Sequence, residues 1–248
     1  MREIRSMGWI ENRRPGNAGG IGNTLEDLLD VAENNRRVPD FGEWEIKSQR
    51  SNTSSLLTLF HTEPMPREER FVPRMLLPRY GWPHQEAGTK YGADERSFRQ
   101  TINATSASDR GFSVVVDRRA QRIYIRFDFS EIGHRHADWQ RFIQSGAGTD
   151  DLSPNPYWTF AELEYTLHTK LSNLMYVQAD TLRQRGNEYF RYNHFEAYMD
   201  PSLESFLNLM DEGYIYVDFD ARTGHNHGTK FRIRADKKVR IYGSIIEV

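Results

Sequence analysis

The residues best suited to catalysis lie in the segment PDFGEWEIK, at positions 39–47. Because strand side chains alternate, Glu45 and Lys47 are expected to project from one face and Ile46 from the other, into the core. A short β-hairpin would bring Asp40 to the face that carries Glu45 and Lys47. Two carboxylates are hard oxygen ligands for Mg²⁺, and an adjacent ammonium can orient a water or steady a phosphate. The segment therefore predicts metal-assisted hydrolysis of a phosphodiester.

The same spacing has a simpler interpretation. Charged residues often do no more than solvate one face of a strand. In that case Lys47 would pair with a neighbouring carboxylate at an exposed strand edge, without any metal. The elements around the segment, and motifs elsewhere in the chain, have to decide between the two.

Composition narrows the class of protein. The chain has 248 residues and no cysteine, so disulfides and thiolate zinc sites are excluded and a cytoplasmic setting is expected. It contains no run of about 18 apolar residues, so no membrane helix is expected. The first residues, MREIRSMGWIENRRPG, lack the apolar stretch of a secretory signal. We therefore expect no membrane partner.

Charge is distributed unevenly along the chain. The net charge is −2, yet residues 221–248 carry seven Lys and Arg against two acidic residues, a local +5. Residues 26–45 carry seven acidic residues against two Arg, a local −5, and they include the expected metal ligands. A basic surface beside an acidic metal pocket suits a polyanion such as DNA. A solvated hairpin face is the alternative for the basic stretch.

The pattern of elements predicts a mixed-sheet α/β (α+β) protein whose second lobe is built on the later strands. A Gly-rich loop at 15–23 should lead into a helix that Asn23 or Thr24 caps. The stretch 62–96 is rich in proline and glycine and is expected to be irregular, as is 133–156. Further helices are expected near 159–170 and 202–211. Strands are expected near 43–48, 55–60, 111–117, 121–128, 173–181, 187–193, 213–219, 229–234 and 239–247.

Several segments together resemble the MvaI/BcnI group of type II restriction endonucleases, which are related to the mismatch-repair nickase MutH. The matching segments, in chain order, are GNAGGIGNTLEDLL at 16–29, PDFGEWEIK at 39–47, SLLTLF at 55–60, RYG at 79–81, YWTF at 157–160 and HNHGTKFRI at 225–233. Their order and spacing make the resemblance specific and almost full-length.

The resemblance implies a restriction-endonuclease-like core of the PD-(D/E)-x-K kind with a second, DNA-reading lobe. On this basis we expect one endonuclease chain, with a catalytic lobe over 1–130 and a recognition lobe over 131–248. The resemblance also implies Mg²⁺-dependent cleavage of double-stranded DNA at a short GC-rich near-palindrome, with Mn²⁺ as a substitute. It implies a monomer that cuts the two strands in succession, and a cognate DNA methyltransferase in the host.

Roles in catalysis follow from the motif and the resemblance together. Asp40 and Glu45 are expected to bind the metal, with the backbone carbonyl of Ile46 as a third ligand. Lys47 would orient the attacking water or stabilise the transition state. In the relatives a helical Glu approaches the same site, and here that position is Glu26. An exposed helix acid is the alternative for Glu26.

A basic hairpin near the C-terminal end is expected to read the DNA. Arg232 can donate two hydrogen bonds to guanine, and His225 and His227 can face base edges. Lys230 is expected to be a plain charge near phosphates, and Arg79 to line the groove. Zinc is a poor alternative for the two histidines, because no third ligand follows at a recognisable spacing. Strand alternation would place Phe231 and Ile233 in the core.

Two other functions stay open at this point. One is a strand-specific nickase that acts with partner proteins, as the resemblance to MutH allows. The other is a DNA-binding protein without catalysis, which the presence of Asp40, Glu45 and Lys47 disfavours. Trp139, Trp158 and Phe160 are expected in the core rather than as stacking platforms, because helical or strand spacing explains them.

Overall fold

A computed structural model describes residues 1–17, 19–30 and 43–247 of the chain. Asp40 and the start of its motif therefore lie outside the described residues. Contacts divide the chain into two compact units, which we treat separately. Unit 1 comprises Met1–Leu57, Glu164–Ser205 and Arg234–Val248, and unit 2 comprises Thr58–Leu163 and Phe206–Ile233.

The two units interleave along the chain. A single boundary near residue 130 was expected from the sequence, whereas each unit contains strands that are distant in sequence. Two of the four boundaries fall within helices, α5 (Phe160–Lys170) and α6 (Leu203–Asp211). None of the helices in the described part of the chain is both long and apolar enough to cross a membrane.

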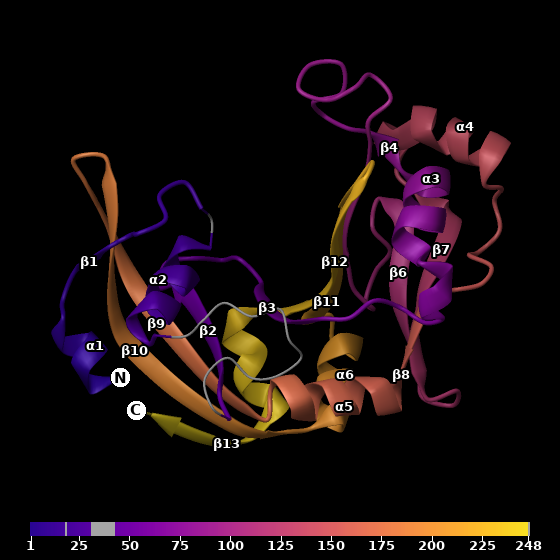
Figure 1. The fold of residues 1–248 in the computed structure, drawn as a ribbon. Helices are drawn as coiled ribbons and strands as arrows, with labels where there is room; N and C mark the ends of the chain where they lie inside the picture. Colours follow the sequence, from indigo (N-terminus) through magenta and orange to yellow (C-terminus); the bar gives the residue numbers. More distant parts are fainter. Residues whose placement is uncertain (18, 31–42, 248) are drawn as a thin grey trace. The chain divides into compact units, whose positions relative to one another are not determined.

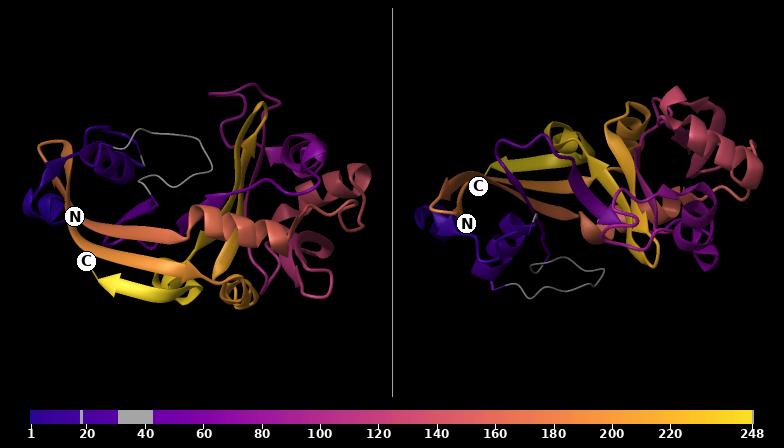
Figure 2. Two further views of the ribbon diagram at one scale, coloured as in Figure 1. Left: turned by 60° about the horizontal axis from the view of Figure 1, so that its bottom comes forward. Right: turned by 90° about the horizontal axis from the view of Figure 1, so that it is seen from above.

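Unit 1 contains, among the described residues, a sheet of five strands (Figure 1). Its strands are β1 (Ile10–Glu11), β2 (Glu45–Arg50), β9 (Asn173–Gln184), β10 (Asn187–Pro201) and β13 (Tyr242–Glu247). β9 and β10 form a long antiparallel hairpin, which Figure 2 shows from two further sides. β2 lies beside β9 and runs parallel to it, with Glu45 opposite Leu174. β1 and β13 pair with different parts of β10.

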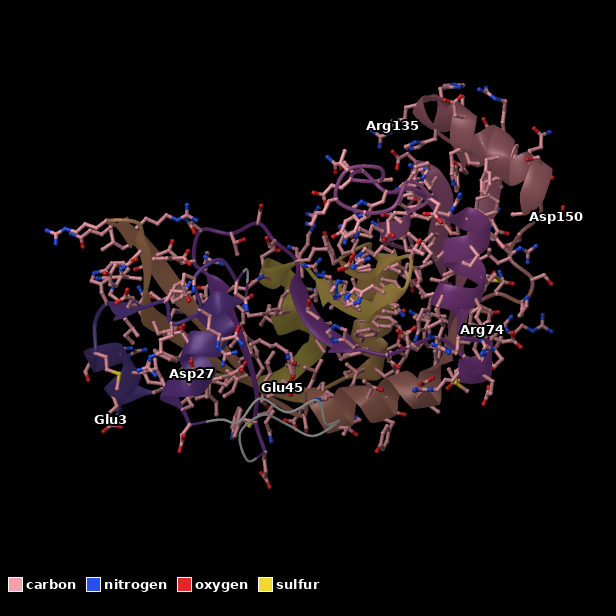
Figure 3. The ribbon with its side chains drawn as sticks, turned by 45° about the horizontal axis from the view of Figure 1, so that its top comes forward. Glu3, Asp27, Glu45, Arg74, Arg135 and Asp150 are labelled. Carbon is pink, nitrogen blue, oxygen red and sulfur yellow. The ribbon has the colours of Figure 1, made fainter. Side chains whose placement is uncertain are left out.

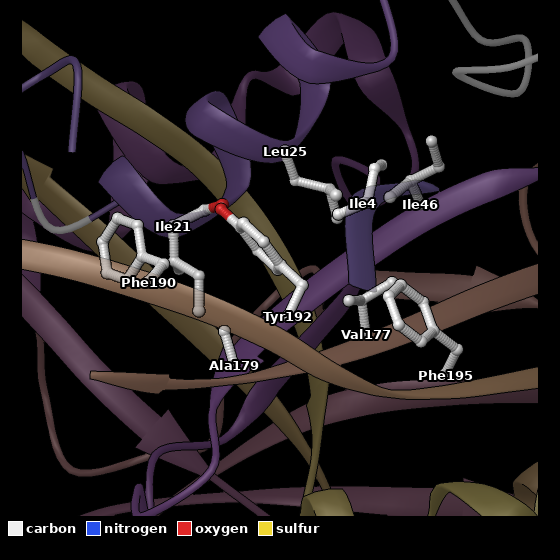
Figure 4. Close-up of a cluster of buried hydrophobic side chains, with 9 residues drawn as sticks. All are labelled: Ile4, Ile21, Leu25, Ile46, Val177, Ala179, Phe190, Tyr192 and Phe195. Carbon is white, nitrogen blue, oxygen red and sulfur yellow. The ribbon is translucent and has the colours of Figure 1, made fainter. Parts of the chain in front are cut away.

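Two helices cover one face of this sheet, α1 (Arg2–Ser6) and α2 (Gly20–Leu28). Ile21 and Leu25 of α2, four residues apart, pack on Ile46 of β2 and on Tyr192 of β10 (Figure 4). The Tyr192 hydroxyl donates a hydrogen bond of 2.7 Å to the carbonyl of Ile21. This joins the helix to the sheet, because a buried carbonyl needs a donor.

Helix α2 begins earlier than the sequence analysis expected. Its N-cap is Gly19 rather than Asn23 or Thr24, so part of the expected glycine loop is helical. A Cβ at Gly20 would lie 2.8 Å from the side chain of Asn12. A side chain at position 20 would therefore have to displace the Asn12 amide, so this glycine serves close packing within the helix. A 3₁₀ segment, η4 (Ala235–Ile241), precedes β13 where a strand was expected from residue 239.

Unit 2 contains two sheets in the described residues, with orders β3-β12-β11-β5-β4 and β6-β7-β8. The strands of the first are β3 (Leu57–His61), β4 (Trp82–Pro83), β5 (Arg96–Ile102), β11 (Ile215–Arg222) and β12 (His225–Ile233). The second has β6 (Arg110–Asp117), β7 (Arg122–Ile132) and β8 (Tyr157–Thr159). The core of unit 2 is rich in fully buried aromatic rings, among them Phe98, Phe112, Phe127, Trp158 and Phe219.

Two stretches expected to be irregular contain helices. The helical pieces in these two stretches are η1 (Arg67–Glu69), the π-helical turn η2 (Val72–Leu76), α3 (Leu77–Tyr80), η3 (His134–His136) and α4 (Ala137–Gly146). Helix α4 buries only Trp139 and Ile143, one turn apart. So short an apolar stripe is hard to recognise among polar residues, which is why the sequence analysis missed this helix. It also missed α1 and β5.

Candidate functional site

Strand β2 separates catalytic candidates from core residues. Ile46 is buried in the hydrophobic cluster of unit 1, while Glu45 and Lys47 contact each other through their side chains. This confirms the alternation that the sequence predicted. Parallel pairing sets Lys47 beside Tyr176 of β9, so the candidates lie at the edge of a well-ordered sheet.

Glu45, which Figure 3 labels, carries a buried carboxylate. Two ammonium groups lie next to it. The Lys47 Nζ donates to its Oε1, and the Lys170 Nζ lies 3.9 Å from its Oε2. Only 5% of the Glu45 side chain is exposed. Burying a charge is costly unless partners compensate it, and these two lysines do so. The arrangement holds a negative oxygen ligand and two cations at one place.

The metal ligands stay a prediction. Asp40 lies outside the described residues, so its distance from Glu45 is not part of the geometry. In the described ranges no three His, Asp or Glu side chains gather as a metal cluster. The described part of the chain contains one buried carboxylate, that of Glu45, and the main-chain carbonyl of Ile46. Both supply oxygen ligands of the type that Mg²⁺ prefers.

Lys170 is a candidate that the sequence analysis missed. It is the last residue of α5 and precedes β9, the strand that pairs with β2. A single lysine at the end of an expected helix carries no signal of its own. Only the parallel pairing of β2 with β9 brings it to Glu45.

A polar network lies beside this pair on the same sheet. Gln49, two residues after Lys47, accepts a hydrogen bond of 2.9 Å from the Tyr176 hydroxyl. The ammonium of Lys238 lies 3.8 Å from the centre of the Tyr176 ring and 3.0 Å from Glu196. Tyr198 donates to the same carboxylate at 2.6 Å. Lys238 is buried, so this cation and Glu196 hold β9, β10 and η4 together.

The protonation of the network follows from burial and charge. Burial raises the pKa of the Tyr176 hydroxyl. Burial also raises the pKa of Tyr242, and the charge of Glu45 adds to it. For Glu196 burial acts to raise the pKa, but hydrogen bonds from Tyr198 and Lys238 outweigh it and the pKa is lowered. Both tyrosines therefore keep their hydroxyl protons at neutral pH, and Glu196 is a carboxylate.

Glu26 lies on α2, the helix that packs on the Ile46 face of β2. Glu45 and Lys47 project from the other face, so α2 does not cover the catalytic candidates. Near Glu26, the carboxylate of Asp27 pairs with Arg14 at 3.2 Å. A supporting role for Glu26 in catalysis stays a prediction.

The expected DNA-reading hairpin is formed by β11 and β12 in unit 2. Phe231 and Ile233 are fully buried, as alternation predicted. Lys230 and Arg232 belong to the opposite face, where they line a shallow pocket of about 300 Å³. Thr229 fixes the strand, because its amide and hydroxyl donate to Glu63 at 3.0 and 3.1 Å.

Carboxylates of β11 alternate with these cations. Arg232 pairs with Asp218 at 3.3 Å, and Lys230 pairs with Asp220 at 3.4 Å. Arg99 of β5 also pairs with Asp220, at 2.8 Å. Lys230 was expected to be a plain surface charge, but its side chain is only 20% exposed. The face therefore presents both acceptors and donors, which is what reading of base edges requires.

The remaining DNA-binding candidates differ in position. His225 and His227 are exposed, with ring centres 4.3 Å apart and nearly perpendicular planes. Arg79 is exposed at the end of α3, whereas Tyr80 is buried against Phe127. Tyr80 thus anchors the end of α3 in the core of unit 2.

The three aromatic residues expected in the core are there. Trp139, Trp158 and Phe160 are 7%, 0% and 6% exposed. The Trp158 indole donates to the carbonyl of Thr62 at 3.1 Å. None of the three rings therefore offers an open face on which a base could stack.

Comparisons with known proteins agree with this geometry. The model of the MvaI/BcnI restriction endonuclease family matches residues 1–242. A solved structure described as a complex of restriction endonuclease MvaI with cognate DNA substrate is 27% identical, with a TM-score of 0.79 over 99% of this chain and 94% of that one. MvaI in the absence of DNA is 26% identical, with a TM-score of 0.52 over 100% and 96%. A search of curated proteins found no match.

Proposed function

The chain belongs to the MvaI/BcnI restriction endonuclease family and is thus a site-specific DNA nuclease, and we propose that it hydrolyses double-stranded DNA with Mg²⁺ at a short GC-rich pseudopalindromic site. The observation that carries the proposal is the buried carboxylate of Glu45 between Lys47 and Lys170. A solvated strand edge, the alternative for this motif, would not bury Glu45.

Glu45, Asp40 and the carbonyl of Ile46 would hold the metal. When bound, Mg²⁺ supplies charge neutralisation at the scissile phosphate and makes a bound water more acidic. Lys47 orients the attacking water and stabilises the negative charge that develops on the phosphate. Lys170 keeps the second oxygen of Glu45 in place. No covalent intermediate is needed: the water oxygen bonds to the phosphorus while the bond from phosphorus to the 3′ oxygen breaks. The products therefore carry 5′-phosphate and 3′-hydroxyl ends.

Sequence readout is assigned to the face of β11 and β12. Arg232 would donate to guanine in the major groove, with His225 and His227 near the base edges. Lys230 and Arg79 would contact phosphates. We further propose that the protein acts as a monomer in the cytoplasm, nicks the two strands in succession, accepts Mn²⁺, and coexists with a methyltransferase that protects host DNA.

Incubation with unmethylated supercoiled plasmid and Mg²⁺ tests the function. Linear fragments with one set of sequenced ends are expected. Open circles that never become linear would instead support a nickase that acts with partners. Plasmid left intact in Mg²⁺ and Mn²⁺, or cut equally well in EDTA, would refute the proposal.

Two variants make the test specific. Glu45→Ala removes a metal ligand and is expected to abolish cleavage while specific binding survives. Glu43→Ala removes an exposed acid two residues earlier and serves as the matched control. Equal cleavage by the two variants would exclude Glu45 from the catalytic site.

A further inference from the structure

A second cationic pocket lies in unit 2, away from the reading face of β11 and β12. Its volume is about 390 Å³. The walls come from β4, β5, β6, η3 and α4, and Asp138 is among the lining residues. Its aromatic and guanidinium side chains include Trp82, Arg96, Arg110, Trp139 and Phe142. None of them belongs to the catalytic or reading residues proposed above.

Aromatic rings fix the two guanidinium groups of this pocket. The guanidinium carbon of Arg110 lies 4.0 Å from the ring centre of Trp82 and 4.9 Å from that of Trp139. The two indoles are nearly perpendicular, so Arg110 sits in the corner between them. Arg96 lies 4.5 Å over the ring of Phe142. Such stacking orders the guanidinium planes before any ligand binds.

The nearby carboxylates have other partners. Asp109 pairs with Arg135 and lies 3.2 Å from His136, and Asp138 pairs with Arg141. Within the described residues neither Arg96 nor Arg110 forms an ion pair with a carboxylate. Arg96 instead donates to the carbonyl of Gly81.

The two cations are thus partly buried without a counter-ion. Burial lowers the pKa of Arg110 to about 10 and also lowers that of Arg96, so both remain charged at neutral pH. Arg96 Nε and Arg110 Nη1 are buried and find no hydrogen-bond acceptor in the described part of the chain. Charges held in this way favour an anion that shares the pocket.

We propose that Arg96 and Arg110 form an anion site for a phosphate group of the DNA backbone outside the base pairs that the reading hairpin contacts. Arg96 also lines a larger cavity of about 1100 Å³, which is bounded by Arg70, Arg222 and the hairpin residues His225 and Asn226. The carboxylates of Glu63 and Asp94 also line this cavity, and Arg96 is the residue that it shares with the pocket of Arg110. Planar guanidinium groups suit phosphate oxygens. The inference rests on the proposed DNA substrate.

The test compares two duplexes that contain the cleaved site, one ending just outside it and one longer by about two helical turns on each side. Binding is measured without divalent metal over a range of NaCl concentrations. For Arg96→Gln and for Arg110→Gln, the salt slope on the long duplex is expected to fall by about one, and by about two in the double variant. The slope on the short duplex is expected to stay as in the wild type.

Two matched variants serve as controls. Arg119→Gln removes an exposed arginine in the turn at the other end of β6, and should change neither slope. Arg110→Lys keeps the charge and should keep most of the slope. Equal slopes for the wild type and the double variant on the long duplex would overturn the DNA assignment.

A second measurement uses the wild-type protein, so it does not depend on whether a variant folds. It also distinguishes DNA phosphate from free phosphate. Trp82 and Trp139 line the pocket, so inorganic phosphate should change the tryptophan fluorescence of the wild-type protein more than chloride of equal ionic strength. A phosphate response without any effect of duplex length would assign the site to free phosphate. Absence of both effects would refute the anion site. Cleavage of the short duplex in Mg²⁺ tests the proposed nuclease separately.

Discussion

At the scale of single residues, the chemical behaviour of Glu45 depends on the two lysines beside it. It is a carboxylate that is almost completely buried, with Lys47 at one oxygen and Lys170 at the other. A metal that binds Glu45 must compete with these ammonium groups. The lysines therefore influence both how tightly the metal binds and how well charge on the phosphate is stabilised.

Lys170→Gln is expected to slow cleavage by about tenfold at saturating Mg²⁺, because a cation near the reacting phosphate is lost. The same change should lower the Mg²⁺ concentration that gives half-maximal rate, because one competitor for Glu45 is gone. Plasmid cleavage over a Mg²⁺ titration measures both. Lys90→Gln, an exposed lysine that pairs with Glu86, is the control. A Lys170→Gln curve that superimposes on the control would exclude this role.

Arg232 and Lys230 should behave differently in binding. Arg232→Ala is expected to weaken binding to the specific site by about 1–3 kcal/mol and to relax discrimination at one G·C pair. Lys230→Ala should weaken binding to all duplexes alike and lower the salt slope by about one. Fluorescence anisotropy with specific and random duplexes separates the two. If Arg232→Ala weakened both duplexes equally, the hairpin would be an electrostatic clamp rather than a reader.

At the scale of elements, unit 1 depends on contacts between strands and the segments that cover them. Helix α2 packs through Ile21 and Leu25 on one face of β2, and Tyr176 supports Gln49 on the other. The Lys238–Glu196 pair joins η4 to β10. β2 thus receives support from both faces, which limits movement of Glu45 and Lys47.

The Lys238–Glu196 pair should make stability depend on pH. In the folded protein the pKa of Glu196 is lowered from its ordinary 4.5. The ion pair therefore contributes fully to stability above about pH 4.5, and this contribution is lost as the pH falls through the folded-state pKa of Glu196. Glu196→Gln should destabilise the protein at pH 7 by about 2 kcal/mol, below the 3–5 of fully buried pairs because Glu196 is 21% exposed. Urea unfolding between about pH 3 and pH 7 measures the difference.

Glu3→Gln, which changes an exposed acid of α1, is the control for that series. The difference between wild type and Glu196→Gln should shrink toward acid, whereas the control should stay near zero throughout. A Glu196→Gln deficit that is constant with pH would show that packing, rather than charge, is lost.

At the scale of the whole molecule, the net charge of the chain does not describe the surface that is proposed to bind DNA. The chain carries −2 overall, yet residues 221–248 carry seven Lys and Arg against two acidic residues. Salt dependence reports the local charge, because counterions are released only where cations meet phosphates.

We expect the affinity of the intact protein for a specific duplex to fall steeply with NaCl, with a slope of about −0.9 for each phosphate contacted. Anisotropy titrations at several salt concentrations, without divalent metal, provide the slope. A flat or rising affinity would mean that the negative net charge governs the encounter.

The sequence by itself determined the family, the mixed α and β class, and the local order of β2, because these depend on residue types at short spacing. Alternation alone separated Ile46 from Glu45 and Lys47, and Phe231 from Lys230 and Arg232.

Tertiary structure decided what the distant residues do. Lys170 reaches Glu45 only because β9 pairs with β2 across more than a hundred residues of chain. Arg96 and Arg110 share a pocket only because α4, whose apolar stripe is one turn long, brings Trp139 to Trp82. Such contacts follow from the pairing of strands and the packing of helices, which no local spacing encodes.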